Sequence, residues 1–218
     1  ELVVARSRHP FALGLLQQAE ARGARTFDRC AAVLAVRDKA RCVLALARGG
    51  VPVPPTFLAH RPVDLRHVPA RLFPLLLKPI LGDNARGIRL VQHPAELSSI
   101  PWGEEQVLAQ QYVDAGGIDL KVYVAGERVW VTRRRSPLQV AQAPAVPGDL
   151  TDELRRLVRL CRRRFGLRLF GLDVLESGAG PLVVDVNEFP NYTGVAEAPD
   201  SIAGLLLAAR GASVTCAP

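Results

Sequence analysis

"LFGLDVLESGAGPLVVDVNEF", residues 169–189, has the form of a β-hairpin that carries acids on one face. A turn centred on Ala179 places Asp173 opposite Asp185, with their Cβ atoms about 5 Å apart. Asn187 lies two residues beyond Asp185 and so shares its face. Opposed carboxylates need a compensating positive charge, and Mg²⁺ accepts carboxylate, amide and phosphate oxygens as ligands. The hairpin therefore predicts a metal site at these three residues; the alternative is an exposed face with two solvated acids.

A second hairpin is predicted over residues 119–134, with a two-residue turn at Gly126 and Glu127. In this register the facing pairs are Asp119 with Arg134 and Lys121 with Thr132. Lys121 and Arg134 then share one face of the hairpin, whereas Arg133 and Arg135 point to the other face. The alternative for the run of three arginines is a solvated strand end.

Lysine is rare in this chain, because only Lys39, Lys78 and Lys121 are lysines among 28 basic residues. Lys78 stands alone in the apolar strand "RLFPLLLKPI" (71–80), where an unpaired cation is costly. A lysine ammonium is a compact point charge suited to phosphate oxygens, whereas arginine imposes a fork geometry. The three positions therefore suggest phosphate contacts, and the alternative is the chance survival of three lysines.

The remaining pattern divides the chain into two parts. Residues 1–50 alternate strand and helix like the end of an α/β domain, with one helix expected over residues 29–48. Residues 51–218 form the main body, and we expect a first subdomain at about 51–113 and a second at about 114–218. The second contains a helix that starts after Thr151, its predicted N-cap.

Composition excludes some classes of protein. The chain has 218 residues, a net charge of +7 and no apolar run of the roughly 18–20 residues that a membrane span needs. The charge allows an anionic partner, but the arginines are spread out and are not interleaved with aromatics, so nucleic acid is disfavoured. Four cysteines without zinc-type spacing (Cys30, Cys42, Cys161, Cys216) suggest reduced thiols and a cytoplasmic location. The absence of methionine suggests part of a longer chain, and the sequence leaves a homo-oligomer open.

Four segments together resemble the ATP-grasp superfamily. They are "RDKARCVLALARGGVPVPPT" (37–56), "FPLLLKP" (73–79), "VLAQQYV" (107–113) and the hairpin with its "DVNEFPNYTGV" end. The resemblance implies an α+β ATP-grasp fold preceded by part of an α/β domain, with ATP and Mg²⁺ as cofactors. It implies phosphate contacts from Lys39 and Lys78 and a flexible flap at residues 81–87. It further implies an adenine pocket lined by Gln110, Gln111, Tyr112 and Val113, and Mg²⁺ at Asp173, Asp185 and Asn187.

Two subfamilies are similar to this chain. RimK-like carboxylate–amine ligases share the Lys39 and Lys78 segments and the pair Asp119 and Lys121, which implies ATP-dependent activation of a carboxylate as an acyl phosphate for attack by an amine. Inositol trisphosphate 5/6-kinases share "GGIDLKVYVAGERVWVTRRRS" (116–136). We predict the ligase, with the kinase and a non-catalytic nucleotide-binding module as alternatives. Lys121 and Arg134 are expected at the transferring phosphoryl group or the acceptor, which is a small molecule or peptide, with an anionic one among the options.

Overall fold

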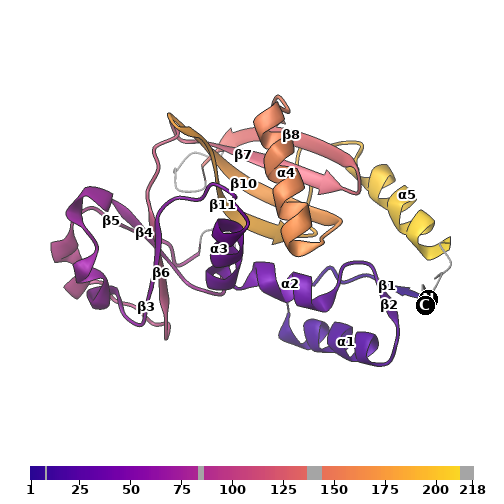
Figure 1. The fold of residues 1–218 in the computed structure, drawn as a ribbon, viewed down its shortest axis with the longest axis horizontal. Helices are drawn as coiled ribbons and strands as arrows, with labels where there is room; N and C mark the ends of the chain where they lie inside the picture. The colour runs from indigo at the N-terminus through magenta and orange to yellow at the C-terminus, as the bar shows by residue number, and fades with distance from the viewer. Residues whose placement is uncertain (8, 83–85, 137–143, 212–218) are drawn as a thin grey trace.

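The computed structural model describes residues 1–7, 9–82, 86–136 and 144–211. Its strands form three sheets of two, four and five strands; the four-stranded sheet lies at one end of the molecule and the five-stranded sheet in its middle (Figure 1). Helices cover the five-stranded sheet, so the predicted α+β class is confirmed. The centre of the expected flap at 81–87 falls outside the described residues.

The N-terminal part alternates strand and helix as predicted. Its elements are β1 (Leu2–Val3), α1 (Pro10–Ala21), β2 (Arg25–Thr26), α2 (Cys30–Arg37) and α3 (Lys39–Arg48), and β1 pairs with β2 in parallel. The prediction of one helix over 29–48 is wrong, because Asp38 adopts an extended conformation between α2 and α3. The Asp38 carboxylate accepts a hydrogen bond from the backbone N of Arg41 at 2.9 Å and so caps α3. This break sets Lys39 at the first position of a new helix.

The four-stranded sheet has the strand order β3-β6-β4-β5 and is antiparallel. Its strands are β3 (Thr56–Ala59), β4 (Leu75–Lys78), β5 (Arg89–Val91) and β6 (Val107–Gln111), and the 3-10 helices η1 (Pro62–His67), η2 (Ala70–Leu72) and η3 (Pro94–Ser98) accompany them. One face buries Leu75, Leu77 and Val107 in a core of its own. Alternation therefore turns Lys78 and Gln110 to the opposite face.

The five-stranded sheet has the order β11-β10-β7-β8-β9. Its strands are β7 (Ile118–Ala125), β8 (Arg128–Arg135), β9 (Val146–Pro147), β10 (Leu169–Ser177) and β11 (Gly180–Glu188); α4 (Asp152–Phe165) and α5 (Ala198–Gly211) complete this part. The predicted N-cap is confirmed, since the Thr151 hydroxyl accepts a hydrogen bond from the backbone N of Leu154. Val122 and Leu172 point into the core shared with α2, α3 and α4. The alternate positions Lys121 and Asp173 point to the other face.

Both predicted hairpin registers are present. β7 and β8 pair Asp119 with Arg134 and Lys121 with Thr132, and β10 pairs Asp173 with Asp185 in β11. The second register depends on an irregularity that the sequence analysis missed, because Ser177 pairs with Gly180 and the register shifts by one residue beyond Val174. The extra residue on β11 is Val184, a β-bulge. Without it, the turn register would set Asp185 on the core face.

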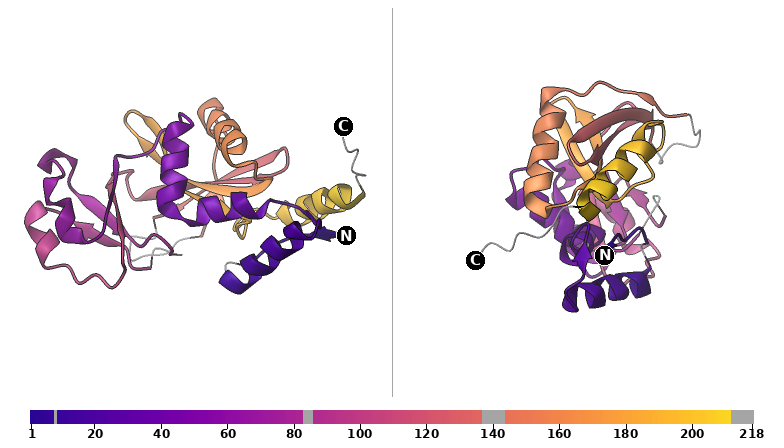
Figure 2. Two further views of the ribbon diagram at one scale, coloured as in Figure 1. Left: turned by 60° about the horizontal axis from the view of Figure 1, so that its bottom comes forward. Right: turned by 90° about the vertical axis from the view of Figure 1, so that its right-hand side faces the viewer.

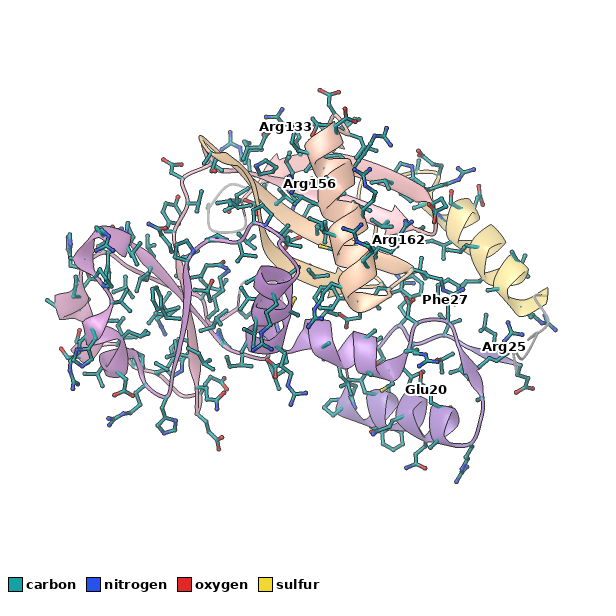
Figure 3. The ribbon with its side chains drawn as sticks, in the orientation of Figure 1. Glu20, Arg25, Phe27, Arg133, Arg156 and Arg162 are labelled. Carbon is teal, nitrogen blue, oxygen red and sulfur yellow. The ribbon has the colours of Figure 1, made fainter. Side chains whose placement is uncertain are left out.

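The N-terminal part is tied to the five-stranded sheet through the segment after β2. The Asp28 carboxylate accepts hydrogen bonds from the backbone N atoms of Arg168 and Leu169 at 2.8 and 3.2 Å, and burial raises its pKa. The Arg168 guanidinium stacks on the Phe27 ring at 3.6 Å from its centroid. Glu20, labelled with Phe27 in Figure 3, accepts hydrogen bonds from the Thr26 hydroxyl and the Cys30 backbone N. The start of the chain is thereby fixed beside the C-terminal half.

Different helices and strands form the two ends of the molecule. The four-stranded sheet occupies one end of an elongated molecule, and α1, β1 and α5 occupy the other (Figure 2). α2 and α3 contribute Val36, Cys42 and Leu46 to the same core as α4 and β10. The domain boundary at residue 50 and the limits of the two subdomains, at about 51–113 and 114–218, remain predictions from the sequence. Among the described helices, none combines the length and the apolar character that crossing a bilayer requires.

Candidate active site

A cavity of about 630 Å³ lies between the two larger sheets, on the face of each that points away from its hydrophobic core. It is lined from β4 and β6 on one side and from β7, β8, β10 and β11 on the other. The predicted site residues that line it are Lys39, Lys78, Gln110, Gln111, Val113, Asp119, Lys121, Arg134, Asp173, Asp185 and Asn187. Tyr112 alone of the predicted set does not line it. The fold thus gathers residues that lie up to 148 positions apart in the sequence, from Lys39 to Asn187.

The two facing carboxylates are each paired with a lysine. Asp185 Oδ2 lies 2.9 Å from Lys39 Nζ, and Asp173 Oδ2 lies 2.5 Å from Lys121 Nζ. Lys39 reaches this position because α3 begins there and its backbone N donates to the Ile80 carbonyl oxygen, next to β4. Two opposed carboxylates thus have positive charge beside both of them, as electrostatics requires.

Lys78 is held differently, by a neutral chain of hydrogen bonds. Its Nζ donates to Gln110 Oε1 at 2.6 Å, Gln110 Nε2 donates to Thr56 Oγ1 at 3.2 Å, and the Thr56 hydroxyl donates to the Pro54 carbonyl oxygen at 2.8 Å. Lys78 is only 7% exposed and Gln110 2%. Burial, above all, lowers the pKa of Lys78 from 10.5 to about 8, although Asp185 partly offsets it. Both polar atoms of the Gln110 amide are therefore occupied within the protein.

The predicted adenine segment is placed at the same end of the cavity. The backbone N atoms of Gln111 and Tyr112 donate to the carbonyl oxygens of Pro55 and Pro74, which fixes the segment against both neighbouring loops. Gln111 and Val113 line the cavity. Asp119 is buried, which raises its pKa, while the nearby Lys121 lowers it.

Several lining residues were not predicted from the sequence. Arg6 comes from the start of the chain, and no local pattern marks it as functional. Asn191 and Thr193 follow β11 in the polar stretch "PNYTG", which was quoted for its resemblance but not assigned. Arg135 was expected to point away, yet it lines the cavity because it ends β8.

The cavity is strongly cationic. Seven of its lining side chains are basic and three are acidic: Arg6, Lys39, Lys78, Arg86, Lys121, Arg134 and Arg135, against Asp119, Asp173 and Asp185. Such a surplus favours polyanionic ligands. A cationic cavity between two antiparallel sheets, one of which carries a hairpin with facing carboxylates, is the arrangement of the ATP-grasp class of protein.

Comparisons with known proteins identify the family within this class. A family model described as RimK-like ATP-grasp domain matches residues 36–208. The chain therefore belongs to the RimK-like ATP-grasp family. A protein of Stutzerimonas stutzeri (strain A1501) named probable alpha-L-glutamate ligase is 27% identical over 220 residues, which cover 90% of this chain and 70% of that protein. A protein of the same name from Azotobacter vinelandii (strain DJ / ATCC BAA-1303) is 29% identical over 207 residues, covering 85% and 66%.

Solved structures show the same fold. A RimK domain protein from Sphaerobacter thermophilus DSM 20745 aligns with a TM-score of 0.75 at 21% identity, covering 94% of this chain and 79% of that one. D-alanine–D-alanine ligase from Bacillus anthracis, complexed with ATP, aligns with a TM-score of 0.71 at 18% identity, covering 93% and 73%. The chain is an ATP-dependent ligase of the carboxylate–amine type, and the kinase alternative is not favoured.

Proposed function

We propose that this ligase binds MgATP with its phosphates at Lys39 and Lys78 and its adenine beside Gln111 and Val113. The observation that carries the proposal is the convergence of all three lysines and the facing carboxylates on one cavity. Lys78 supports it most directly, because a buried ammonium whose hydrogen-bond acceptor is a neutral amide gains a charged partner when a phosphate enters.

Asp173, Asp185 and Asn187 fit a magnesium ion by donor chemistry. They offer two carboxylates and an amide oxygen from one face of β10 and β11, which suits a hard cation that also binds phosphate oxygens. Among the described residues, no group of three or more His, Cys, Asp or Glu gathers as a metal cluster, in keeping with an amide as the third donor. Bound Mg²⁺ would neutralise phosphate charge. In the structure, the ammonium groups of Lys39 and Lys121 supply the positive charge that offsets the repulsion between the two carboxylates.

The chain's own residues then carry the transfer by position and charge. Lys121 and Arg134 lie on one face of β7 and β8, where they would hold the accepting carboxylate and stabilise the charge that develops on the phosphoryl group. A carboxylate oxygen forms a bond to the γ-phosphorus as the bond to ADP breaks. The amine nitrogen then bonds to the acyl carbon, inorganic phosphate leaves, and the amine loses a proton to solvent.

The substrates follow from the relatives and from the cavity charge. The relatives are named glutamate ligases, and we propose that glutamate or a short acidic peptide is joined through its amine to a carboxylate of a small molecule or peptide. A cytoplasmic location agrees with the use of ATP and with Cys30, Cys42 and Cys161, which are free thiols.

The experiment is incubation of the protein with MgATP and pooled amino acids and acidic peptides, with ADP, phosphate and product masses measured. The proposal predicts equal amounts of ADP and phosphate and a product whose mass equals both substrates less one water. A phosphorylated product without free phosphate, or no ADP with any acceptor, would contradict it.

A further inference from the structure

Three arginines and a loop line the part of the cavity wall that lies outside the four-stranded sheet. Arg134 and Arg135 come from the end of β8, and Arg6 comes from the segment between β1 and α1. The loop is residues 189–195, which follows β11 and contributes Asn191 and Thr193. We name these residues the arginine end.

In the part of the chain that the structure describes, the arginine end contains no ion pair within hydrogen-bond reach, in contrast to the lysine–carboxylate pairs nearby. Among the described residues, no carboxylate lies within 4.0 Å of a guanidinium nitrogen of Arg6, Arg134 or Arg135. Asp119 faces Arg134 in the strand ladder; burial raises the pKa of Asp119, and the charge of Arg134 contributes to lowering it without a contact close enough for an ion pair. Arg134 Nε is buried without a hydrogen-bond partner. Arginines that line one cavity without a paired carboxylate, one of them with an unsatisfied buried donor, indicate that the cavity accepts anionic groups.

Arg6 is held in place before any ligand arrives. Its guanidinium lies 5.3 Å from the centroid of the Phe189 ring, and its Nη2 donates to Asn191 Oδ1 at 3.4 Å. Because one face of the Arg6 guanidinium lies over the ring, its N–H groups at the edge can still donate hydrogen bonds. The hydrogen bond to Asn191 is long and therefore weak.

The loop that carries these partners is in a strained conformation. Phe189 and Tyr192 have φ angles of 36° and 51°, which are unfavourable for residues other than glycine. Packing maintains this conformation, since the Tyr192 hydroxyl donates to the Val124 carbonyl oxygen at 2.6 Å and its ring contacts that of Tyr123. Asn191 and Thr193, which lie in this loop, line the cavity.

We propose that Arg6, stacked on Phe189, binds a carboxylate of the amine substrate that the reaction does not consume, and thereby selects an acidic substrate. This inference rests on the proposed function and assigns its amine site. Arg134 remains at the reacting carboxylate, so the two arginines serve different anionic groups of the bound substrates. Asn191 and Thr193 supply neutral hydrogen bonds beside Arg6.

Three variants separate charge recognition from a merely structural role of Arg6. Arg6→Met keeps an apolar side chain against the Phe189 ring and removes the charge. Arg6→Lys keeps the positive charge but loses the planar guanidinium that can donate two parallel hydrogen bonds to a carboxylate. Asn191→Asp leaves Arg6 unchanged and places an internal carboxylate beside it, which should compete with the ligand. Arg22→Ala is the matched control, because Arg22 is exposed at the end of α1 and does not line the cavity.

The experiment is calorimetric titration with L-glutamate, L-glutamine and the α-amide of L-glutamate, with and without MgADP. The wild type should bind glutamate at least about tenfold more tightly than one of the two amides, the discrimination expected of a charge-assisted hydrogen bond. Arg6→Met and Asn191→Asp should reduce that ratio to within about twofold, Arg6→Lys should retain part of it, and Arg22→Ala all of it. Thermal unfolding of each variant checks its fold.

The outcomes are distinguishable from those of the proposed function. Equal affinities in the wild type, no binding of glutamate, or a ratio that Arg6→Met and Asn191→Asp both leave intact would overturn the inference. If the preference for glutamate over the amides depends on Arg6 but the protein releases no ADP with any acceptor, the result supports the proposed role of Arg6. It then contradicts only the proposed ligation.

Discussion

The lysines of the cavity lie in two contrasting environments. At the five-stranded sheet, Asp173 and Asp185 compensate the charge of Lys121 in β7 and that of Lys39 at the start of α3. On the four-stranded sheet, Lys78 is buried against the neutral amide of Gln110, and its pKa falls to about 8. One sheet therefore supplies ion pairs that a metal can replace, whereas the other holds a cation with no acid in hydrogen-bond contact. The difference supports the proposal that a metal binds at the carboxylates and that Lys78 contacts phosphate from the opposite side of the cavity.

The largest effect is expected from breaking the acidic side. Asp185→Asn removes half of the facing carboxylate charge, so Mg²⁺-dependent release of ADP should fall by more than about a hundredfold, the scale of losing a key electrostatic contact. Glu176→Gln is the matched control, because Glu176 is on the same hairpin, is exposed and does not line the cavity. A folded Asp185→Asn protein that turns over ATP at nearly the wild-type rate in saturating Mg²⁺ would show that the metal assignment is wrong.

On the phosphate side, Lys78→Arg keeps the charge and changes its geometry. Because a planar guanidinium does not reproduce the contact of the Lys78 ammonium with Gln110, the free energy of nucleotide binding should weaken by about 1–3 kcal/mol, the range for hydrogen bonds to charged groups. Calorimetry with ADP measures this, and Arg89→Lys, on the exposed neighbouring strand, should have no effect. Unchanged affinity in Lys78→Arg would mean that any cation suffices there.

The burial of Lys78 also predicts a pH dependence of stability. Since its folded pKa of about 8 lies below 10.5, the unfolded chain binds more protons between these values. The free energy of unfolding should therefore rise with pH across this window in the wild type, relative to Lys78→Met. The difference between the two proteins should change by about 2 kcal/mol from pH 7 to pH 10. Parallel denaturant titrations of the two proteins would contradict the account if their difference stayed constant.

The smallest effect concerns the far end of the Lys78 chain. Thr56→Val removes the acceptor of the Gln110 amide, so the Gln110 side chain loses its fixed orientation and nucleotide affinity should weaken by about 1 kcal/mol, the net value of one hydrogen bond. Thr56→Ser keeps the hydroxyl and should restore affinity. If Thr56→Val and Thr56→Ser bind ADP equally, Gln110 holds Lys78 without help from Thr56.

The sequence predicted the parts of the site that depend on strand alternation. The pairing of Asp173 with Asp185 and of Asp119 with Arg134 followed from turn position and a period of two. The bulge at Val184 did not, because no residue type marks it, and the predicted pairing was reached with a turn placed differently from the actual one. The break at Asp38 was missed because both flanking segments are good helix formers.

Contacts between distant segments could not be predicted. Arg6 and Asn191 meet because the segment around Phe27 is anchored to Arg168, and no local pattern encodes that anchoring. The orientation of the Gln110 side chain toward Lys78 similarly depends on how β4, β6 and β3 assemble. Sequence resemblance marked the segment "VLAQQYV" (107–113) but not the direction in which the side chain of Gln110 points.

The most direct test of the account is to trap the activated carboxylate. Protein, MgATP and the acidic pool are incubated with hydroxylamine, and Asp185→Asn serves as the matched inactive variant. The account predicts a hydroxamate, with ADP and phosphate released in equal amounts, from the wild type alone. A stable phosphoester with no hydroxamate and no free phosphate would contradict it.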